Sequence, residues 1–105
     1  MSINPPNPES FIIEREGAER GVLVLKRQGT AVGRVDYHVT NSTIYVDYVE
    51  VSPAERGQGL GVRLVDAVAA WARESAQTVV PICGYARQVL ASDASYRDVF
   101  TPGGR

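Results

Sequence analysis

The chain has 105 residues, of which 44% are hydrophobic and 22% charged, and its net charge is −1. These values are typical of one globular domain, and the small net charge provides no general field for binding nucleic acid. No apolar run approaches the length of a membrane span. The single cysteine, Cys83, excludes an internal disulfide and a cysteine-based metal cluster, and it favours a reducing, cytoplasmic location.

Residues 1–9 are rich in proline and carry neither the basic nor the apolar segment of a signal peptide. We therefore predict a disordered lead-in over residues 1–9, one domain over residues 10–100 and a flexible tail over residues 101–105.

Four strand-like segments follow the lead-in, over residues 10–16, 21–27, 33–40 and 42–51. In the last of them, the alternation places Ile44, Val46 and Tyr48 together on one face. The breaks between the segments are short and turn-like, which predicts an antiparallel meander.

The apolar period becomes helical over residues 60–75, where one stripe holds Leu60, Leu64, Val68 and Trp71 or Ala72. A short buried strand over residues 78–81 and a weaker helix over about 85–92 come next, and Tyr96, Val99 and Phe100 are expected to fold back onto the core. The predicted architecture is an α+β fold in the order β-β-β-β-α-β-α, with a mostly antiparallel sheet.

The segment from Val49 to Gly61 joins a strand end to a helix start through a proline, an arginine and alternating glycines. Glycines allow close approach of a ligand, and the free N–H groups and dipole of a helix N-terminus attract anions. The segment therefore predicts an anion site, with a phosphate group as the expected ligand. A P-loop is excluded because Gly61 precedes Val-Arg instead of Lys-Ser/Thr, and the G-x-G-x-G spacing differs from a dinucleotide fingerprint.

The sequence Arg-Gly-Gln-Gly-Leu-Gly at residues 56–61 resembles the R/Q-x-x-G-x-G/A acyl-CoA pyrophosphate loop of the GCN5-related N-acetyltransferases (GNAT). Glu50-Val51, the Pro-Ile-Cys-Gly-Tyr segment at residues 81–85 and Ser-Tyr-Arg-Asp-Val at residues 95–99 resemble the small YjdJ-type acetyltransferase domains, over residues 11–100. This resemblance implies a reduced GNAT fold without the helices that wall the acceptor cleft in larger relatives.

The resemblance also implies acetyl-CoA as the cofactor, with no metal and with an unidentified amine, small molecule or protein, as the acceptor. The implied cofactor-binding residues fall into two groups. At the strand end, the backbone of Val49 and Val51 would pair with the pantetheine amides. The loop would bind the pyrophosphate, through Arg56, Gly57, Gln58, Gly59, Leu60 and Gly61. Neither nucleic acid nor a membrane is an expected partner.

Three residues are candidates for catalysis. Glu50 could act as the general base, Tyr85 could protonate the departing thiolate, and Cys83 could accept the acyl group or simply line the site. The simpler interpretations are a solvated or ion-paired carboxylate, an aromatic side chain packed at a helix start and an inert small hydrophobe.

The family often has His-Thr where this chain has Tyr48-Val49, so the catalytic role of that histidine does not carry over. Tyr48 is expected to pack within its strand. A CoA- or acyl-CoA-binding module without turnover and a protein-interaction domain are the alternatives to an enzyme.

Overall fold

A computed structural model describes residues 11–100, so the predicted lead-in and tail lie outside the described residues. The elements are β1 (Phe11–Glu16), β2 (Arg20–Arg27), β3 (Thr30–Thr40), β4 (Thr43–Val51), the 3-10 helix η1 (Pro53–Glu55), α1 (Leu60–Glu74), β5 (Thr78–Pro81), α2 (Gly84–Ala91) and the 3-10 helix η2 (Ala94–Tyr96). This order of strands and main helices confirms the predicted architecture. No helix within residues 11–100 is long and apolar enough to cross a membrane.

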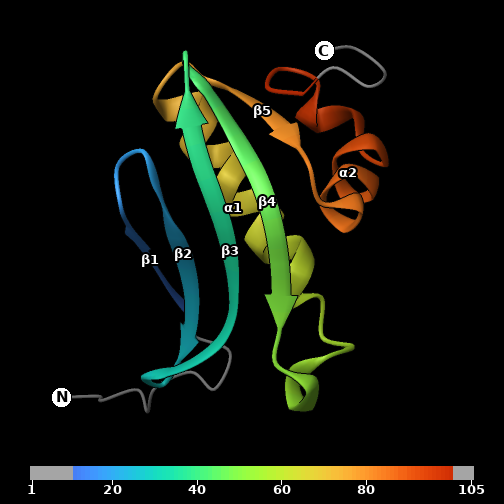
Figure 1. Cartoon of the computed structure of the whole chain (residues 1–105). Coiled ribbons are helices and arrows are strands. Elements are labelled where there is room, and N and C mark those ends of the chain that lie inside the picture. The colour runs from blue at the N-terminus through green and yellow to red at the C-terminus, as the bar shows by residue number, and fades with distance from the viewer. Residues whose placement is uncertain (1–10, 101–105) are drawn as a thin grey trace, which may run out of the picture.

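The five strands form one sheet in the order β1-β2-β3-β4-β5 (Figure 1). The first four strands are antiparallel neighbours, as the short turns predicted, whereas β5 pairs with β4 in parallel. A parallel neighbour requires a crossover connection, and α1 provides it by running behind the sheet (Figure 1).

The third strand begins at Thr30, three residues before the predicted start at Gly33. The turn before it is made by Gln28 and Gly29, whose φ values of 52° and 84° suit a tight hairpin. Gly33 lies inside β3, where a Cβ would approach Leu64 Cδ1 to 2.9 Å. This glycine therefore serves close packing of α1 on the sheet and does not form a turn.

A β-bulge in β4 reverses the predicted alternation. Tyr37 pairs with Val46 and Asp36 pairs with Tyr48, so Asp47 is the extra residue between them. Val46 is fully buried, but Tyr48 is 50% exposed. The prediction that Tyr48 packs within the strand with Val46 is therefore wrong, because one extra residue moves every following side chain to the opposite face.

One side chain from the neighbouring strand, that of His38, contacts the bulge. His38 Nδ1 lies 2.8 Å from Asp47 Oδ2, and the His38 ring stacks on Tyr45 with centroids 4.6 Å apart. His38 thus forms a polar contact with the bulged residue itself, at the place where β4 changes its phase.

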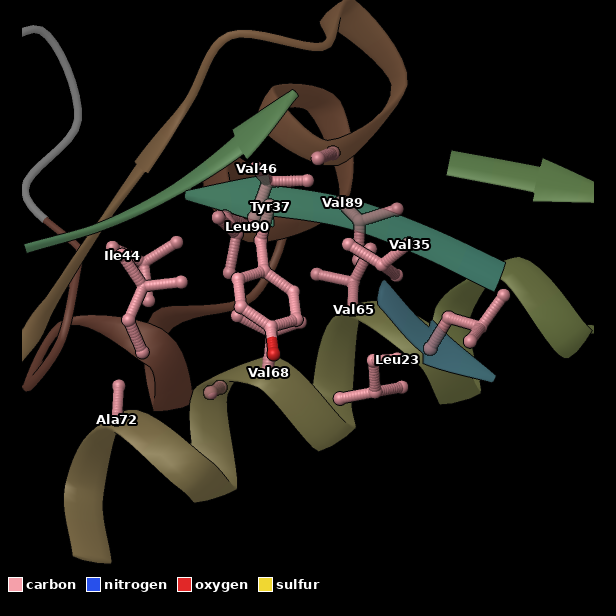
Figure 2. Close-up of a cluster of buried hydrophobic side chains, with 14 of the residues drawn as sticks. Leu23, Val35, Tyr37, Ile44, Val46, Val65, Val68, Ala72, Val89 and Leu90 are labelled. Carbon is pink, nitrogen blue, oxygen red and sulfur yellow. The ribbon is translucent and has the colours of Figure 1, made fainter. Parts of the chain in front are cut away.

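The core lies between the sheet and α1 (Figure 2). The predicted stripe of α1 is buried at Leu60, Leu64, Val68 and Ala72, whereas Trp71 is only partly buried and meets the Tyr37 ring edge-on at 4.9 Å. Complete burial of a side chain such as Leu64 contributes about 2 kcal/mol. The predicted return of the C-terminal segment is confirmed by the burial of Tyr96, Val99 and Phe100.

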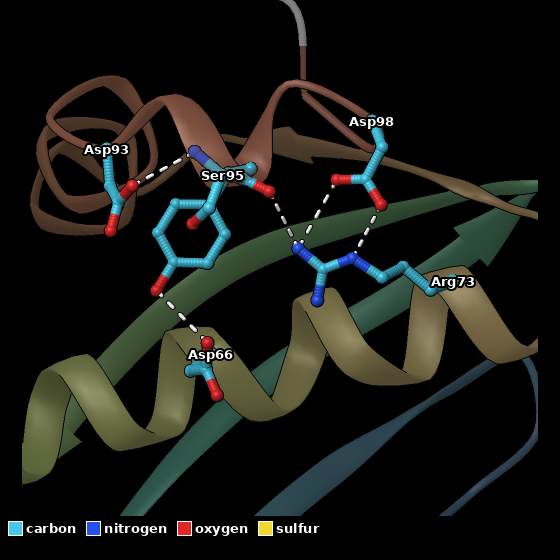
Figure 3. A network of polar contacts seen from close by, with 6 residues as sticks. Asp66, Arg73, Asp93, Ser95 and Asp98 are labelled. Atoms are coloured by element: carbon cyan, nitrogen blue, oxygen red, sulfur yellow. Dashed lines mark hydrogen bonds and ion pairs between the residues drawn. The ribbon is translucent and has the colours of Figure 1, made fainter.

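Polar contacts fasten this C-terminal segment to α1 (Figure 3). Arg73 Nε donates to Asp98 Oδ2 at 2.5 Å, and Arg73 Nη2 donates to the Ser95 carbonyl at 2.9 Å. Tyr96 Oη donates to Asp66 Oδ1 at 3.3 Å. The hydrogen bond from Arg73 lowers the pKa of Asp98, while desolvation, followed by the charge of Asp66, raises the pKa of Tyr96.

We predict that Asp98→Asn lowers the thermal midpoint at pH 7 and that this difference from the parent protein shrinks at low pH. The folded-state pKa of Asp98 lies below its ordinary value of 3.8. The contribution of Asp98 to the stability of the fold is therefore present above pH 3.8 and is lost as the pH falls through the folded-state pKa. Melting curves between pH 2 and pH 7 test this, with the exposed Glu74→Gln as the matched control. A difference in thermal midpoint that stays constant with pH would contradict a stabilising contact between Arg73 and ionised Asp98.

Candidate functional site

The loop before α1 depends on glycines with positive φ. Gly57 has φ 86°, and Gly59, the N-cap of α1, has φ 75°. A Cβ at either position would meet nothing within 4 Å, so the backbone conformation and not a lack of space requires glycine there. The absence of side chains also leaves the loop backbone open to a ligand.

The N-terminus of α1 carries free hydrogen-bond donors. Arg63 N donates to the Gly59 carbonyl at 3.1 Å, but no acceptor among residues 11–100 takes the N–H groups of Leu60, Gly61 or Val62. The first turn contains no acidic residue, and Gly59 provides no side-chain cap. The helix dipole and three free N–H groups therefore form the geometry that binds an anion.

The strand beside this helix has an open edge. β5 pairs with β4 only over Thr43–Val46, after which Ile82 N and Cys83 N both donate to the Val46 carbonyl, at 2.9 and 3.0 Å. The chain then turns into α2, while β4 continues to Val51 (Figure 1). The last part of β4 thus has no strand partner on this side within the described part of the chain, which leaves backbone groups for an extended ligand.

A cavity of about 490 Å³ lies where these elements meet. Its volume is within the usual range for a small-molecule site. Its lining comes from the end of β4, the loop, the start of α1 and the start of α2, and it comprises Tyr48, Val49, Glu50, Val51, Glu55, Arg56, Gly57, Gly59, Leu60, Gly61 and Tyr85. All the predicted cofactor and catalytic residues except Gln58 and Cys83 are brought together there.

Arg56 contributes a cationic side chain to this cavity. The residue is exposed, and its Nε donates to the Val51 carbonyl at 3.3 Å. This contact holds the guanidinium between the end of β4 and the loop.

Glu50 lines the same cavity and is half exposed. Its Oε1 lies 3.7 Å from Arg34 Nε, and Arg34 also lies 3.4 Å from Asp36. An exposed and shared ion pair of this kind is weak, so Glu50 remains available to a ligand.

Tyr85 reaches the cavity from the start of α2 and packs over Gly61. A Cβ on Gly61 would lie 2.5 Å from Tyr85 Oη and 2.8 Å from its Cζ. Glycine at position 61 is therefore what allows the phenol to lie over the first turn of α1.

The two remaining predicted residues do not line the cavity. Cys83 is partly buried against the core and is the N-cap residue of α2. The Gln58 side chain instead accepts from Arg27 Nη2 at 2.7 Å and donates to Glu55 Oε1 at 3.1 Å.

Sequence reasoning missed two residues that line the cavity, Tyr48 and Glu55. Tyr48 faces it because of the bulge, which alternation cannot reveal. Glu55 directly precedes Arg56 in the sequence. A carboxylate inside a loop predicted to bind an anion could have indicated that a cation from elsewhere in the chain neutralises it. No group of three metal-ligating side chains is present within residues 11–100.

Fold and cavity together define an α+β protein with a strand–loop–helix unit whose free N–H groups suit an anion. The model of a protein family described as GCN5-related N-acetyl-transferase matches residues 21–99. The chain therefore belongs to the GCN5-related N-acetyltransferase family, and its five-stranded mixed sheet with two helices is the acyl-CoA N-acyltransferase fold.

Solved structures agree with this assignment. A GCN5-like protein from Staphylococcus aureus is 29% identical, with a TM-score of 0.67 over 88% of this chain and 91% of that chain. The ribosomal-protein-S18-alanine N-acetyltransferase of Escherichia coli shares the fold at 16% identity and a TM-score of 0.62, over 73% of this chain and 53% of its own.

A Bacillus anthracis protein named for streptothricin acetylation was solved in complex with acetyl coenzyme A. It shares the fold at 18% identity and a TM-score of 0.53, over 62% of this chain and 39% of its own. The chain thus spans about half or less of these two larger proteins. A comparison with curated proteins finds no match.

We predict that the effect of Gly61→Ala depends on Tyr85. In a Tyr85→Ala background, the added methyl group meets no phenol, and the better helix propensity of alanine stabilises the protein by up to about 1 kcal/mol. With Tyr85 present, the phenol must move, which removes most of that gain. Urea unfolding of the four proteins measures this coupling, and an equal gain in both backgrounds contradicts the described packing.

Proposed function

We propose that this protein binds acetyl-CoA and transfers the acetyl group to an amine. The observation that carries the proposal is that the open edge of β4, the glycine loop and the free N-terminus of α1 meet in one cavity. The family assignment supports the same ligand, and a fold relative was solved with acetyl coenzyme A. We extend the proposal to the YjdJ-type subgroup and a cytoplasmic location, on the sequence features alone.

In this proposal, the N–H groups at Gly57–Gly61 bind the diphosphate of CoA, and Arg56 adds a charge-assisted contact. The backbone at Val49 and Val51 pairs with the pantetheine amides, which resemble a peptide and extend the sheet at its open edge. The thioester then lies toward Glu50 and Tyr85, which both line the cavity.

Transfer requires a neutral amine. A lysine-like acceptor with a pKa of about 10.4 costs about 4.6 kcal/mol to deprotonate at pH 7. We assign Glu50 as the general base that removes this proton, directly or through water, and Tyr85 as the acid that protonates the departing thiolate. Direct attack of the amine on the thioester is favoured over an acyl-cysteine because Cys83 packs against the core.

One observation favours a second candidate, a CoA-binding module without turnover. Within residues 11–100, no helix covers the sheet face opposite α1, where Val22 and Val24 are only partly buried. On this face, an acceptor amine would find few side chains to bind and orient it. Incubation with labelled acetyl-CoA and a panel of amines and peptides separates the candidates, because binding without transfer supports the module.

We predict that Gly59→Glu abolishes acetyl-CoA binding in calorimetry. The new carboxylate would fill the open loop and repel the diphosphate. Gly29→Glu is the matched control, since Gly29 has a φ of 84° and equally open surroundings but does not line the cavity. The control is expected to bind acetyl-CoA like the parent protein. A parent protein that shows no saturable binding of acetyl-CoA would contradict the proposal.

Direct transfer predicts different effects for two further variants. Glu50→Gln should lower kcat by about 100-fold with an unchanged CoA affinity, because it removes the base and no binding contact. Cys83→Ala should change kcat by no more than about threefold, because a partly buried cysteine that takes no part in the transfer acts only as a small hydrophobe. Mass spectrometry of the protein after incubation with acetyl-CoA provides the decisive check, since an acetyl group trapped on Cys83 contradicts direct transfer.

A further inference from the structure

A carboxylate lines the cavity that we propose to bind a diphosphate. Glu55 is the last residue of η1, directly before Arg56 and Gly57. An unpaired negative charge at this position would repel an anion and oppose the field of the α1 N-terminus. The loop therefore requires a cation that neutralises Glu55.

That cation comes from the end of β2, 28 residues away in the sequence. Arg27 Nη1 donates to Glu55 Oε1 at 2.8 Å, and Arg27 Nη2 donates to Gln58 Oε1 at 2.7 Å. Gln58 Nε2 closes the triangle by donating to Glu55 Oε1 at 3.1 Å. The Arg27 and Glu55 side chains are each only 22% exposed, so salt screens this pair less than a surface pair.

The guanidinium of Arg27 also contacts an aromatic ring. It lies 5.1 Å from the centroid of the Phe11 ring, and the guanidinium of Arg63 lies 4.4 Å from the same ring. Arg27 Nε is buried and has no hydrogen-bond partner within the described part of the chain. The polar contacts of the Arg27 side chain are therefore made by Nη1 and Nη2, which bind Glu55 and Gln58.

We propose that Arg27 is a positioning residue for CoA, which neutralises Glu55 and braces Gln58 so that the loop accepts a diphosphate. This inference rests on the proposed function. Arg27 is not part of the cavity lining and acts through the two loop side chains. A merely structural brace would not depend on the charge of Glu55, and this difference makes the role testable.

Calorimetry with CoA on four proteins tests the inference: the parent, Arg27→Met, Glu55→Gln and the double variant. Arg27→Met is expected to weaken CoA binding about tenfold or more, because it leaves a negative charge in the cavity. Glu55→Gln should bind CoA as well as the parent or better. The double variant should regain most of the lost affinity.

Pantetheine, which has no diphosphate, is the control ligand, and its affinity should be the same for all four proteins. Parent-like CoA binding by Arg27→Met overturns the inference, and so does a double variant as weak as Arg27→Met. A parent protein that fails to bind CoA instead overturns the proposed function itself.

If Arg27→Met does not fold, Arg27→Lys replaces it. Lysine keeps the charge but cannot contact Glu55 and Gln58 with two fixed nitrogens. A partial loss of CoA affinity is then expected, and Glu55→Gln should relieve it. Unrelieved loss overturns the inference.

Discussion

The site depends on the point where β5 stops pairing with β4. The two strands are joined only over Thr43–Val46, and the next two N–H groups of the chain both donate to the Val46 carbonyl. Because β5 leaves there, the end of β4 keeps free backbone groups and α2 begins close to α1. That geometry brings Tyr85 over Gly61 and closes one side of the cavity.

Charge arrangement decides what this cavity can bind. The free N–H groups of α1 and the side chain of Arg56 favour an anion, whereas Glu55 opposes it. Arg27, which does not line the cavity, pairs with Glu55 and neutralises its negative charge. The bulge at Asp47 adds an aromatic side chain to the lining, since it turns Tyr48 toward the cavity.

Local patterns predicted most of the fold and the loop. The strand at residues 78–81 and the start of α1 at Leu60 were correct, because their signals lie in a few neighbouring residues. The bulge was not predictable, since one extra residue at Asp47 looks like ordinary alternation. Nor was the contact between Arg27 and Glu55, which depends on how β2 and the loop meet in three dimensions. The early start of β3 was missed because Gly33 resembles a turn residue but accommodates Leu64.

The central claim is that one cavity binds CoA through backbone groups of the loop and of the open edge of β4. NMR titration of the isotope-labelled protein with CoA tests it most directly, because each backbone amide reports separately. The account predicts saturable shifts that are largest at the amides of Gly57, Gly59, Leu60 and Gly61, with smaller ones at Val49 and Val51. Saturable shifts elsewhere that leave these amides unchanged would contradict it.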